Sequence, residues 1–280
     1  HTPDISFTNE ATRSEVMANA YFLRAYCYFT LVRVFGDCPL LTSGFESEKQ
    51  EDMYPSRTAA SEVYAQVETD IEEALRLMPA SSKLLHKASP AAINMLRTEY
   101  YLWKAKRLGG GNAALSTAQS SVDAVLKAGY TLLPTFADIF NLNNEANSEL
   151  IWTLPYIVNE NVTPGTSPNF FAYYLAPNGD RTRLREAGYT EDEVPAGSHA
   201  QYVVPTQAYC DFLAEDARDT RTDVSVRVFE DKFLTEEVQI KRMVVKFKGS
   251  FANDTRSFDS DVPVYRLAEA YLLKAEVENA

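Results

Sequence analysis

The stretch YFLRAYCYFTLVRVFGDCPL, residues 21–40, decides the fold because it combines a dense apolar run with two arginines. At helical spacing, apolar groups surround the axis of this segment, so we expect a helix that is buried on every side. Arg24 and Arg33 interrupt the run well short of the ~18 apolar residues that a membrane span needs. We therefore predict the central helix of a helical array, ended by Gly36 and Pro39.

Both arginines of this helix are predicted to be structural. An unpaired guanidinium group is costly inside a protein, so Arg24 and Arg33 should lie against a carboxylate or a carbonyl or extend to the rim of the array, and we predict that each is largely buried with such a partner. One carboxylate from the next helical segment is a candidate partner, although these acidic residues should mainly form the solvated face of their helix: Glu68, Asp70, Glu72 and Glu73.

The composition excludes several classes of function. The 280 residues include 39 acidic and 27 basic ones, and the net charge of -12 repels a phosphate backbone, so no nucleic-acid partner is expected. The three cysteines form no CxxC pair and the three histidines are dispersed, so we predict no catalytic residue, metal or cofactor. Cys27 is expected to be a small buried hydrophobe. The sequence does not decide whether Cys38 and Cys210 form a disulfide bond.

Helical patterns continue through the first half of the chain. Segments 58–78, 89–109 and 112–128 place apolar residues at helical spacing. The motif that begins at Leu96 repeats the one that begins at Leu23, and EYYLWKA from Glu99 is matched by EAYLLKA from Glu269. This repetition predicts a mainly α, tetratricopeptide-like scaffold of helical hairpins over residues 11–129. A chance likeness between aromatic helices is the alternative.

The chain changes character after residue 129. Segments 150–154, 224–229 and 244–247 are typical of strands, and 206–213 of a short helix, within loops rich in Asn, Gly, Pro and aromatics. A helical pattern returns at residues 263–280. We therefore predict an irregular loop and short-strand insert over residues 130–262, followed by a returning scaffold helix.

The best candidate for a ligand site lies in this insert. A sugar presents an apolar C–H face and a rim of hydroxyls, so its site needs a flat ring beside amide, carboxylate or guanidinium groups. One run supplies both kinds of group: Phe170, Phe171, Tyr173, Tyr174, Asn178, Asp180 and Arg181. A loop that pins its rings into the scaffold is the competing interpretation.

A second cluster in the insert could in principle hold calcium. Its members lack the spacing of an EF-hand loop, so a solvated acidic turn is favoured. The residues are Asn253, Asp254, Asp259 and Asp261.

An ordered set of segments resembles the SusD/RagB-type proteins. The segment ANAYFLRAYCYFTLVRVFGDCPLL resembles the family's arginine-aromatic helix and its Gly-Asp-x-Pro-Leu exit. Five further segments follow in the family's order: SEVYAQVETDIEEALRLMP, KASPAAINMLRTEYYLWKA, YTLLPTFADIFNLNNEANSELIWTLPY, VVPTQAYCDFLAEDARDTR and VPVYRLAEAYLLKAEVENA. The resemblance covers nearly the whole chain and implies one SusD-like domain over residues 1–280 with a tetratricopeptide-like scaffold.

This resemblance also implies a function. Proteins of this family are glycan-binding lipoproteins of the bacterial outer-membrane surface, so we expect non-catalytic binding of oligosaccharide or polysaccharide and its delivery to a TonB-dependent outer-membrane transporter. A peptide-binding helical-repeat adaptor remains an alternative, and a glycoside hydrolase with paired carboxylates is a less favoured one. Family members usually carry a lipidated cysteine and extend further at both ends, so the chain resembles a fragment and its lipid anchor rests on the resemblance.

Overall fold

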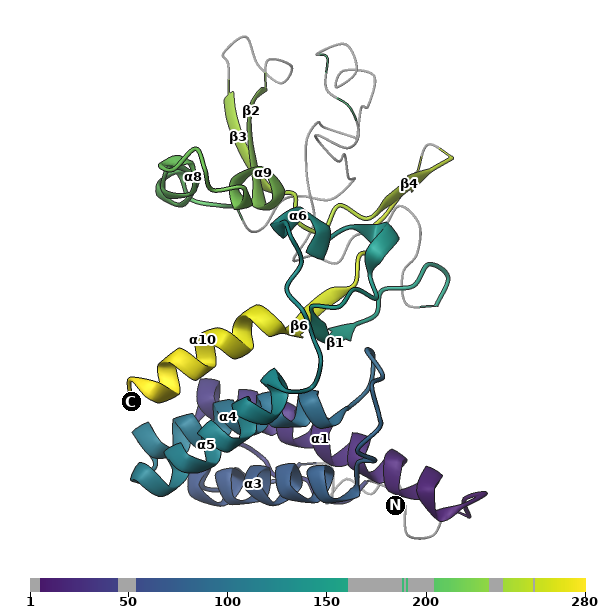
Figure 1. The fold of residues 1–280 in the computed structure, drawn as a ribbon, viewed down its shortest axis with the longest axis vertical. Coiled ribbons are helices and arrows are strands. Elements are labelled where there is room, and N and C mark those ends of the chain that lie inside the picture. Colours follow the sequence, from purple (N-terminus) through teal and green to yellow (C-terminus); the bar gives the residue numbers. More distant parts are fainter. Residues whose placement is uncertain are drawn as a thin grey trace. The chain divides into compact units, whose positions relative to one another are not determined.

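The computed structural model describes residues 6–44, 54–160, 188, 190, 204–231, 239–253 and 255–280 (Figure 1). The chain divides into two compact units. The first comprises residues 1–131, 150–152 and 265–280, and the second comprises residues 132–149 and 153–264. Within the described residues, no helix is both long enough and apolar enough to cross a bilayer.

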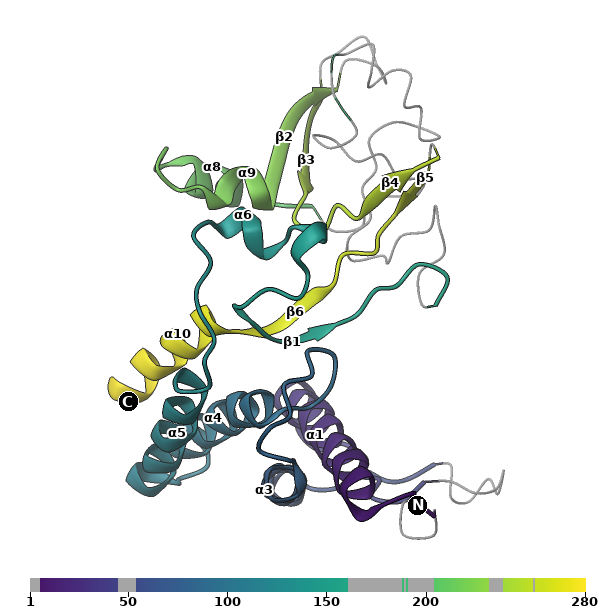
Figure 2. The same cartoon turned by 45° about the vertical axis from the view of Figure 1, so that its right-hand side comes forward.

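The first unit is helical. Its helices are α1 (Glu10–Phe35), α3 (Ala60–Leu77), α4 (Pro90–Arg107), α5 (Gly111–Leu126) and α10 (Leu267–Glu278). Helix α1 packs mainly on α3, α4 packs mainly on α5, and α10 lies against α5 and α4 (Figures 1 and 2). Two successive helix pairs and a further helix confirm the predicted mainly α, tetratricopeptide-like fold.

Local sequence signals set the ends of these helices. The Asn9 side chain accepts a hydrogen bond from the backbone N–H of Thr12 at 2.8 Å and begins α1. Ser89 caps α4 in the same way, and Pro90 occupies the first turn, where no backbone donor is needed. Gly36, at φ +67°, ends α1 as predicted.

An aromatic cluster forms the core of the first unit. The ring of Phe22 meets Trp152 edge-on at 4.8 Å, and Tyr26 meets the same indole at 5.0 Å. Phe29 contacts Tyr100 in a similar geometry at 5.7 Å. Because such pairs add to the burial of apolar area, they stabilise the packing of α1 against α4 and the short strand that carries Trp152. Trp152 is itself a core residue, since it is 2% exposed.

Helix α1 is not buried on every side, so that prediction is wrong. Phe22, Ala25 and Phe29 are buried, whereas Leu23 is 48% exposed and Val34 is 67% exposed. Cys27, expected to be buried, is exposed as well. In the described part of the chain the elements that contact α1 cover one of its faces, and an apolar sequence pattern does not specify how many neighbours a helix has.

Arg24 ties α1 to α3. Its Nε donates to Asp70 Oδ2 at 2.7 Å, and its Nη2 donates to Oδ1 at 2.6 Å. The Asp70 side chain is 1% exposed and that of Arg24 is 26% exposed. The expected carboxylate partner of Arg24 is therefore found, and the expectation that Asp70 lies on the solvated face of its helix is wrong. A third bond, from Nη1 to the Thr42 carbonyl at 3.1 Å, also holds the chain that follows α1.

Arg33 differs from Arg24. It is exposed, its Nε donates to the Phe29 carbonyl of its own helix at 3.3 Å, and its guanidinium lies 4.0 Å from the centroid of the Phe29 ring. The predicted burial of Arg33 is wrong because the residue stands in the last turn of α1.

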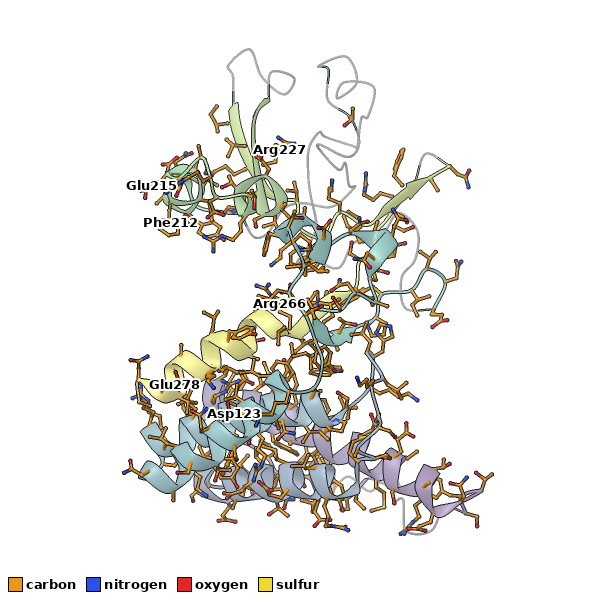
Figure 3. The ribbon with its side chains drawn as sticks, viewed as in Figure 1. Asp123, Phe212, Glu215, Arg227, Arg266 and Glu278 are labelled. Atoms are coloured by element: carbon orange, nitrogen blue, oxygen red, sulfur yellow. The ribbon has the colours of Figure 1, made fainter. Side chains whose placement is uncertain are left out.

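The repeated motif corresponds to repeated ion pairs. Lys104 and Lys274 each follow the first glutamate of the motif by five positions. Lys104 donates to Glu68 on α3 at 2.7 Å, and Lys274 donates to Asp123 on α5 at 2.8 Å. Figure 3 labels Asp123 together with Glu278, a second carboxylate 3.6 Å from Lys274. Each helix that carries the motif thus pairs with the second helix of the preceding pair.

The second unit contains short elements. Its helices are α6 (Phe136–Ile139), the 3-10 turn η2 (Leu142–Asn144), α8 (Gln207–Ala214) and α9 (Arg221–Ser225). Strand β2 (Val226–Asp231) pairs antiparallel with β3 (Gln239–Val244), and β4 (Ser250–Ala252) pairs antiparallel with β5 (Thr255–Ser257) (Figure 2). Strands β1 (Leu150–Leu154) and β6 (Val262–Arg266) form another two-stranded sheet, and the division between the units runs through both strands.

Three predicted boundaries change. The strand expected at residues 244–247 is wrong beyond Val244, because a turn follows that residue. The strand expected from residue 224 begins at Val226, after the last turn of α9. The helix expected from residue 263 begins at Leu267, because the preceding residues pair with β1. In each case an apolar run marks burial without specifying the backbone conformation.

We predict that Arg24→Ala lowers the free energy of unfolding by about 3 kcal/mol, because it leaves the buried carboxylate of Asp70 without its bidentate partner. Urea unfolding of the 280-residue chain measures the effect. Arg76→Ala is the matched control, since Arg76 pairs with Glu73 at the surface and its loss should leave the stability nearly unchanged. Equal stabilities for the two variants would contradict a structural role for Arg24.

Candidate functional site

A hollow of ≈ 400 Å³ lies in the second unit. Residues from α6, η2, α9 and the segment after β3 line it. Its volume falls in the range of roughly 300–1,000 Å³ that is typical of ligand pockets. The lining combines one aromatic ring with amide, carboxylate and ammonium groups: Phe140, Asn141, Asn143, Asp138, Asp223 and Lys246.

Short-range hydrogen bonds position the polar groups of this hollow. Thr135 caps α6: its Oγ1 accepts from the backbone N–H of Asp138 at 3.3 Å and donates to the carboxylate of Asp138 at 2.8 Å. The side-chain oxygen of Asn141 accepts from the backbone N–H of Asn143 at 3.0 Å. The Asn147 side chain donates to the Asn144 carbonyl at 2.9 Å and so stabilises the turn between these two residues. Such local bonds hold the lining in place before any ligand arrives.

Phe140 and Lys246 of the lining pack with two further rings, Phe136 and Phe247. The ammonium of Lys246 lies 4.3 Å from the ring centroid of Phe140 and 5.4 Å from that of Phe136. Phe140 meets Phe136 edge-on at 5.1 Å and Phe247 at 5.7 Å. Cation–π and edge-to-face attraction therefore fix the orientation of the Phe140 ring, which is half-buried and lines the hollow.

Gly249 closes the hollow on the side of β4 and β5. Its φ is +68°, and a Cβ atom at this position would lie 1.9 Å from the Ser257 carbonyl oxygen. The backbone N–H of Gly249 donates to Ser260 Oγ at 3.0 Å. Only glycine fits this close approach without displacing the β4–β5 hairpin.

The predicted sugar-binding run lies outside the described residues. Its members are Phe170, Phe171, Tyr173, Tyr174, Asn178, Asp180 and Arg181. They therefore remain predictions. The sequence analysis did not assign a ligand role to the lining residues of the hollow, although the signal was present in FADIFNLNN, an aromatic and asparagine-rich run at residues 136–144.

The acidic turn near residue 259 is engaged in structural bonds. Asp259 accepts from the backbone N–H of Ser250 at 2.6 Å, and Asp261 accepts from the backbone N–H of Tyr156 at 3.0 Å. Asp254 lies outside the described residues. In the part of the chain that the structure describes, no group of three His, Cys, Asp or Glu side chains could hold a metal ion.

The first unit holds a buried group of titratable side chains. The Tyr265 hydroxyl donates to Glu99 Oε2 at 2.6 Å. Burial raises the pKa of Glu99, against the opposing effects of the Tyr265 bond and the Arg33 charge. Burial, and then the charge of Glu99, raises the pKa of Glu269 to about 7. Burial and the repulsion between two negative charges both favour the protonated form of a carboxyl group.

Comparisons with known proteins agree with this fold. A family model described as "Starch-binding associating with outer membrane" matches residues 5–101. SusD-like protein P25 of Formosa agariphila (strain DSM 15362 / KCTC 12365 / LMG 23005 / KMM 3901 / M-2Alg 35-1) is 26% identical over 97% of the chain and 53% of its own length. SusD-like protein P2 of the same strain is 25% identical over 94% of the chain and 52% of its own length. The chain thus spans about half the length of the curated relatives it matches.

Solved structures show the same likeness. The chain resembles B. fragilis NanU with a TM-score of 0.77 and 25% identity over 99% of the chain and 57% of that protein. It also has the fold of a protein described as "Laminarin binding SusD-like protein", with a TM-score of 0.69 and 20% identity over 99% of the chain and 62% of that protein. The matches support a SusD-type family for the chain, as the sequence resemblance indicated.

We predict that Gly249→Ala destabilises the protein by about 2 kcal/mol or more, because the new methyl group collides with the backbone of β5. Thermal unfolding, followed by a spectroscopic signal from the second unit, measures the loss of stability. Gly44→Ala is the control, since Gly44 has no heavy atom within 4 Å of an added Cβ. If both variants melt as the parent does, the close approach at Gly249 is not a constraint.

Stability should also depend on pH through Glu269. The pKa of this carboxyl is about 7 in the folded protein against an ordinary 4.5, so its contribution is full below about pH 4.5 and is lost as the pH rises through about 7. After allowance for solvent screening, the loss should be roughly 1–2 kcal/mol.

The measurement is the melting temperature between about pH 5 and pH 8. Glu269→Gln should remove much of the fall, whereas Glu62→Gln, at an exposed position of α3, should not. Parallel profiles for all three proteins would mean that Glu269 does not titrate in this range.

Proposed function

We propose that the protein binds oligosaccharide or polysaccharide at the cell surface without cleaving it and delivers it to a TonB-dependent outer-membrane transporter. The match to a starch-binding, outer-membrane-associating family model and the likeness to SusD-like proteins support the binding of glycan. The hollow of the second unit is the observation that carries the proposal, because its ring and amides match the two faces of a sugar.

Two kinds of contact bind the sugar in the proposed site, ring stacking and hydrogen bonding. The ring of Phe140 offers an apolar surface for the C–H face of a sugar. Asn141 and Asn143 line the hollow and are exposed, and a carboxamide both donates to and accepts from hydroxyl groups. Asp138 and Asp223 supply further acceptors. This combination of neutral and charged hydrogen-bonding groups suits a polyhydroxylated ligand.

The predicted run in the insert adds to this site in our proposal. Phe170, Phe171, Tyr173 and Tyr174 would supply stacking surfaces, and Asn178, Asp180 and Arg181 would supply hydrogen bonds. All seven belong to the same irregular segment of the sequence as the lining of the hollow. A long glycan needs more than one sugar-sized contact, so two sets of rings would raise its affinity.

Attachment to the outer membrane and the transporter partner are also part of the proposal. The family model's description supports an association with the outer membrane. A lipidated cysteine is the expected anchor of the whole protein, which would present the binding surface outside the cell. Copurification of the full-length protein with a large outer-membrane β-barrel tests the partner, and its reproducible absence from native membrane complexes would count against delivery.

The binding step is tested by calorimetric titration of the chain with neutral glycans such as laminarin and starch. Phe140→Ala should weaken binding by more than about 1 kcal/mol, roughly fivefold, if the ring is an anchor. Asn143→Ala should weaken it by a similar amount. Phe212→Ala is the matched control, since Phe212 is 63% exposed on α8 and does not line the hollow.

The same samples separate the competing functions. Product analysis over time should find no shortened glycan, because a binder does not turn its ligand over. Accumulating fragments would favour a hydrolase, and binding of peptides in place of glycans would favour an adaptor. Unchanged glycan affinity in the Phe140 and Asn143 variants would remove this hollow from the proposed site.

A further inference from the structure

A second hollow, of ≈ 390 Å³, lies in the first unit, where residues from α1, α4 and α10 meet. Arg33 comes from the last turn of α1, and Lys106 and Arg107 come from the last turn of α4. Trp103 also lines this hollow, as do the apolar side chains of Leu102 and Leu273. The hollow therefore joins three cationic groups to an indole ring.

The cations of this hollow differ from the others on the same helices. Arg24 and Lys104 each bind a carboxylate, whereas within the described residues no carboxylate lies within 4 Å of the charged groups of Arg33, Lys106 or Arg107. The negative end of a helix dipole explains a cation in the last turn of one helix. It does not explain why cations from two helices converge on one hollow, in a chain whose net charge is -12.

Two acidic side chains, Glu99 and Glu276, belong to the same lining. Glu99 already accepts the Tyr265 hydroxyl, and its burial favours the protonated, neutral form. Glu276 is exposed at the C-terminal end of α10. The lining thus carries three cationic side chains against two acidic ones, and an anion that enters the hollow is attracted by this excess of positive charge.

The indole ring is held in place. Trp103 Nε1 donates to the Tyr64 hydroxyl at 3.1 Å, and the guanidinium of Arg107 lies 5.9 Å from the indole centroid. Trp103 is half-buried, so part of its ring is accessible from the hollow. A fixed flat ring beside a guanidinium group matches a ligand that has both an apolar face and a negative charge.

We propose that this hollow binds a sugar that carries a carboxylate. The indole of Trp103 stacks on the C–H face of the sugar, and Arg33 and Arg107 bind its carboxylate, for which the planar guanidinium group is suited. Lys106 adds a less directional positive charge. This site goes beyond the glycan-binding hollow of the second unit, and either one can fail without the other.

Intrinsic fluorescence of the 280-residue chain tests the proposal. The chain has two tryptophans, and Trp152 is only 2% exposed, so a ligand-induced change reports on Trp103. Titration with D-glucuronate should give a saturable change, at a concentration at least about tenfold lower than glucose or acetate requires. The affinity should fall as salt is added, because the carboxylate contact is electrostatic.

Substitutions assign the contacts. Arg33→Gln and Arg107→Gln should each weaken glucuronate binding by at least about fivefold, with Lys106→Gln having a smaller effect. Trp103→Phe should abolish the fluorescence change. Arg76→Gln, on α3 and paired with Glu73 at the surface, should leave the affinity unchanged. All the variants change half-buried or exposed side chains, and an unchanged melting temperature confirms that each one is folded.

Three outcomes would overturn the proposal. These are a titration in which glucuronate brings no saturable change, binding of acetate or inorganic sulfate as tight as that of glucuronate, and parent-like affinity in both arginine variants. The second outcome would reduce the site to one for simple anions. Failure of neutral glycans to bind the hollow of the second unit would leave this result unaffected.

Discussion

The buried carboxylate of Asp70 is the constraint on which the first unit depends. A charge that is 1% exposed is tolerated only while it is bonded, and Arg24 and Gln66 supply those bonds from α1 and from its own helix. The bidentate geometry accepts one register of α1 on α3. In that register Phe22 contacts Trp152 and Phe29 contacts Tyr100 in the interior of the unit. A polar contact thus selects the alignment that the apolar core then stabilises.

The same solution recurs along the helical array. Lys104 reaches back to Glu68, and Lys274 reaches back to Asp123, from equivalent positions of the repeated motif. Tyr100 and Tyr101 also donate to Glu68, so the carboxylate is bonded by neutral and charged groups together. What repeats in the sequence is therefore a means of attaching each new helix to the pair before it.

The sequence predicted those features that depend on local chemistry. The end of α1 at Gly36, the strand at residues 150–154 and the pairing of Arg24 follow from residue type and spacing. The exposure of Leu23 and Arg33 could not be predicted, because it depends on which elements surround α1. The lining of the second-unit hollow was missed for a related reason: segments about 80 residues apart contribute to it, and no pattern in either segment identifies the other.

The second unit interrupts the sequence of the helical unit, and this arrangement determines where the chain can vary without affecting the helices. Residues 153–264 belong to the second unit and interrupt the sequence of the helical unit between Trp152 and Tyr265. These two residues are members of one aromatic cluster. Their indole and phenol rings are 5.9 Å apart, so the two ends of this segment are anchored by the core of the scaffold itself. Loops and hairpins between these anchors can be exchanged or lengthened without altering the residues that fold the helices. The helical unit thus supplies both attachment points of residues 153–264 from its own core.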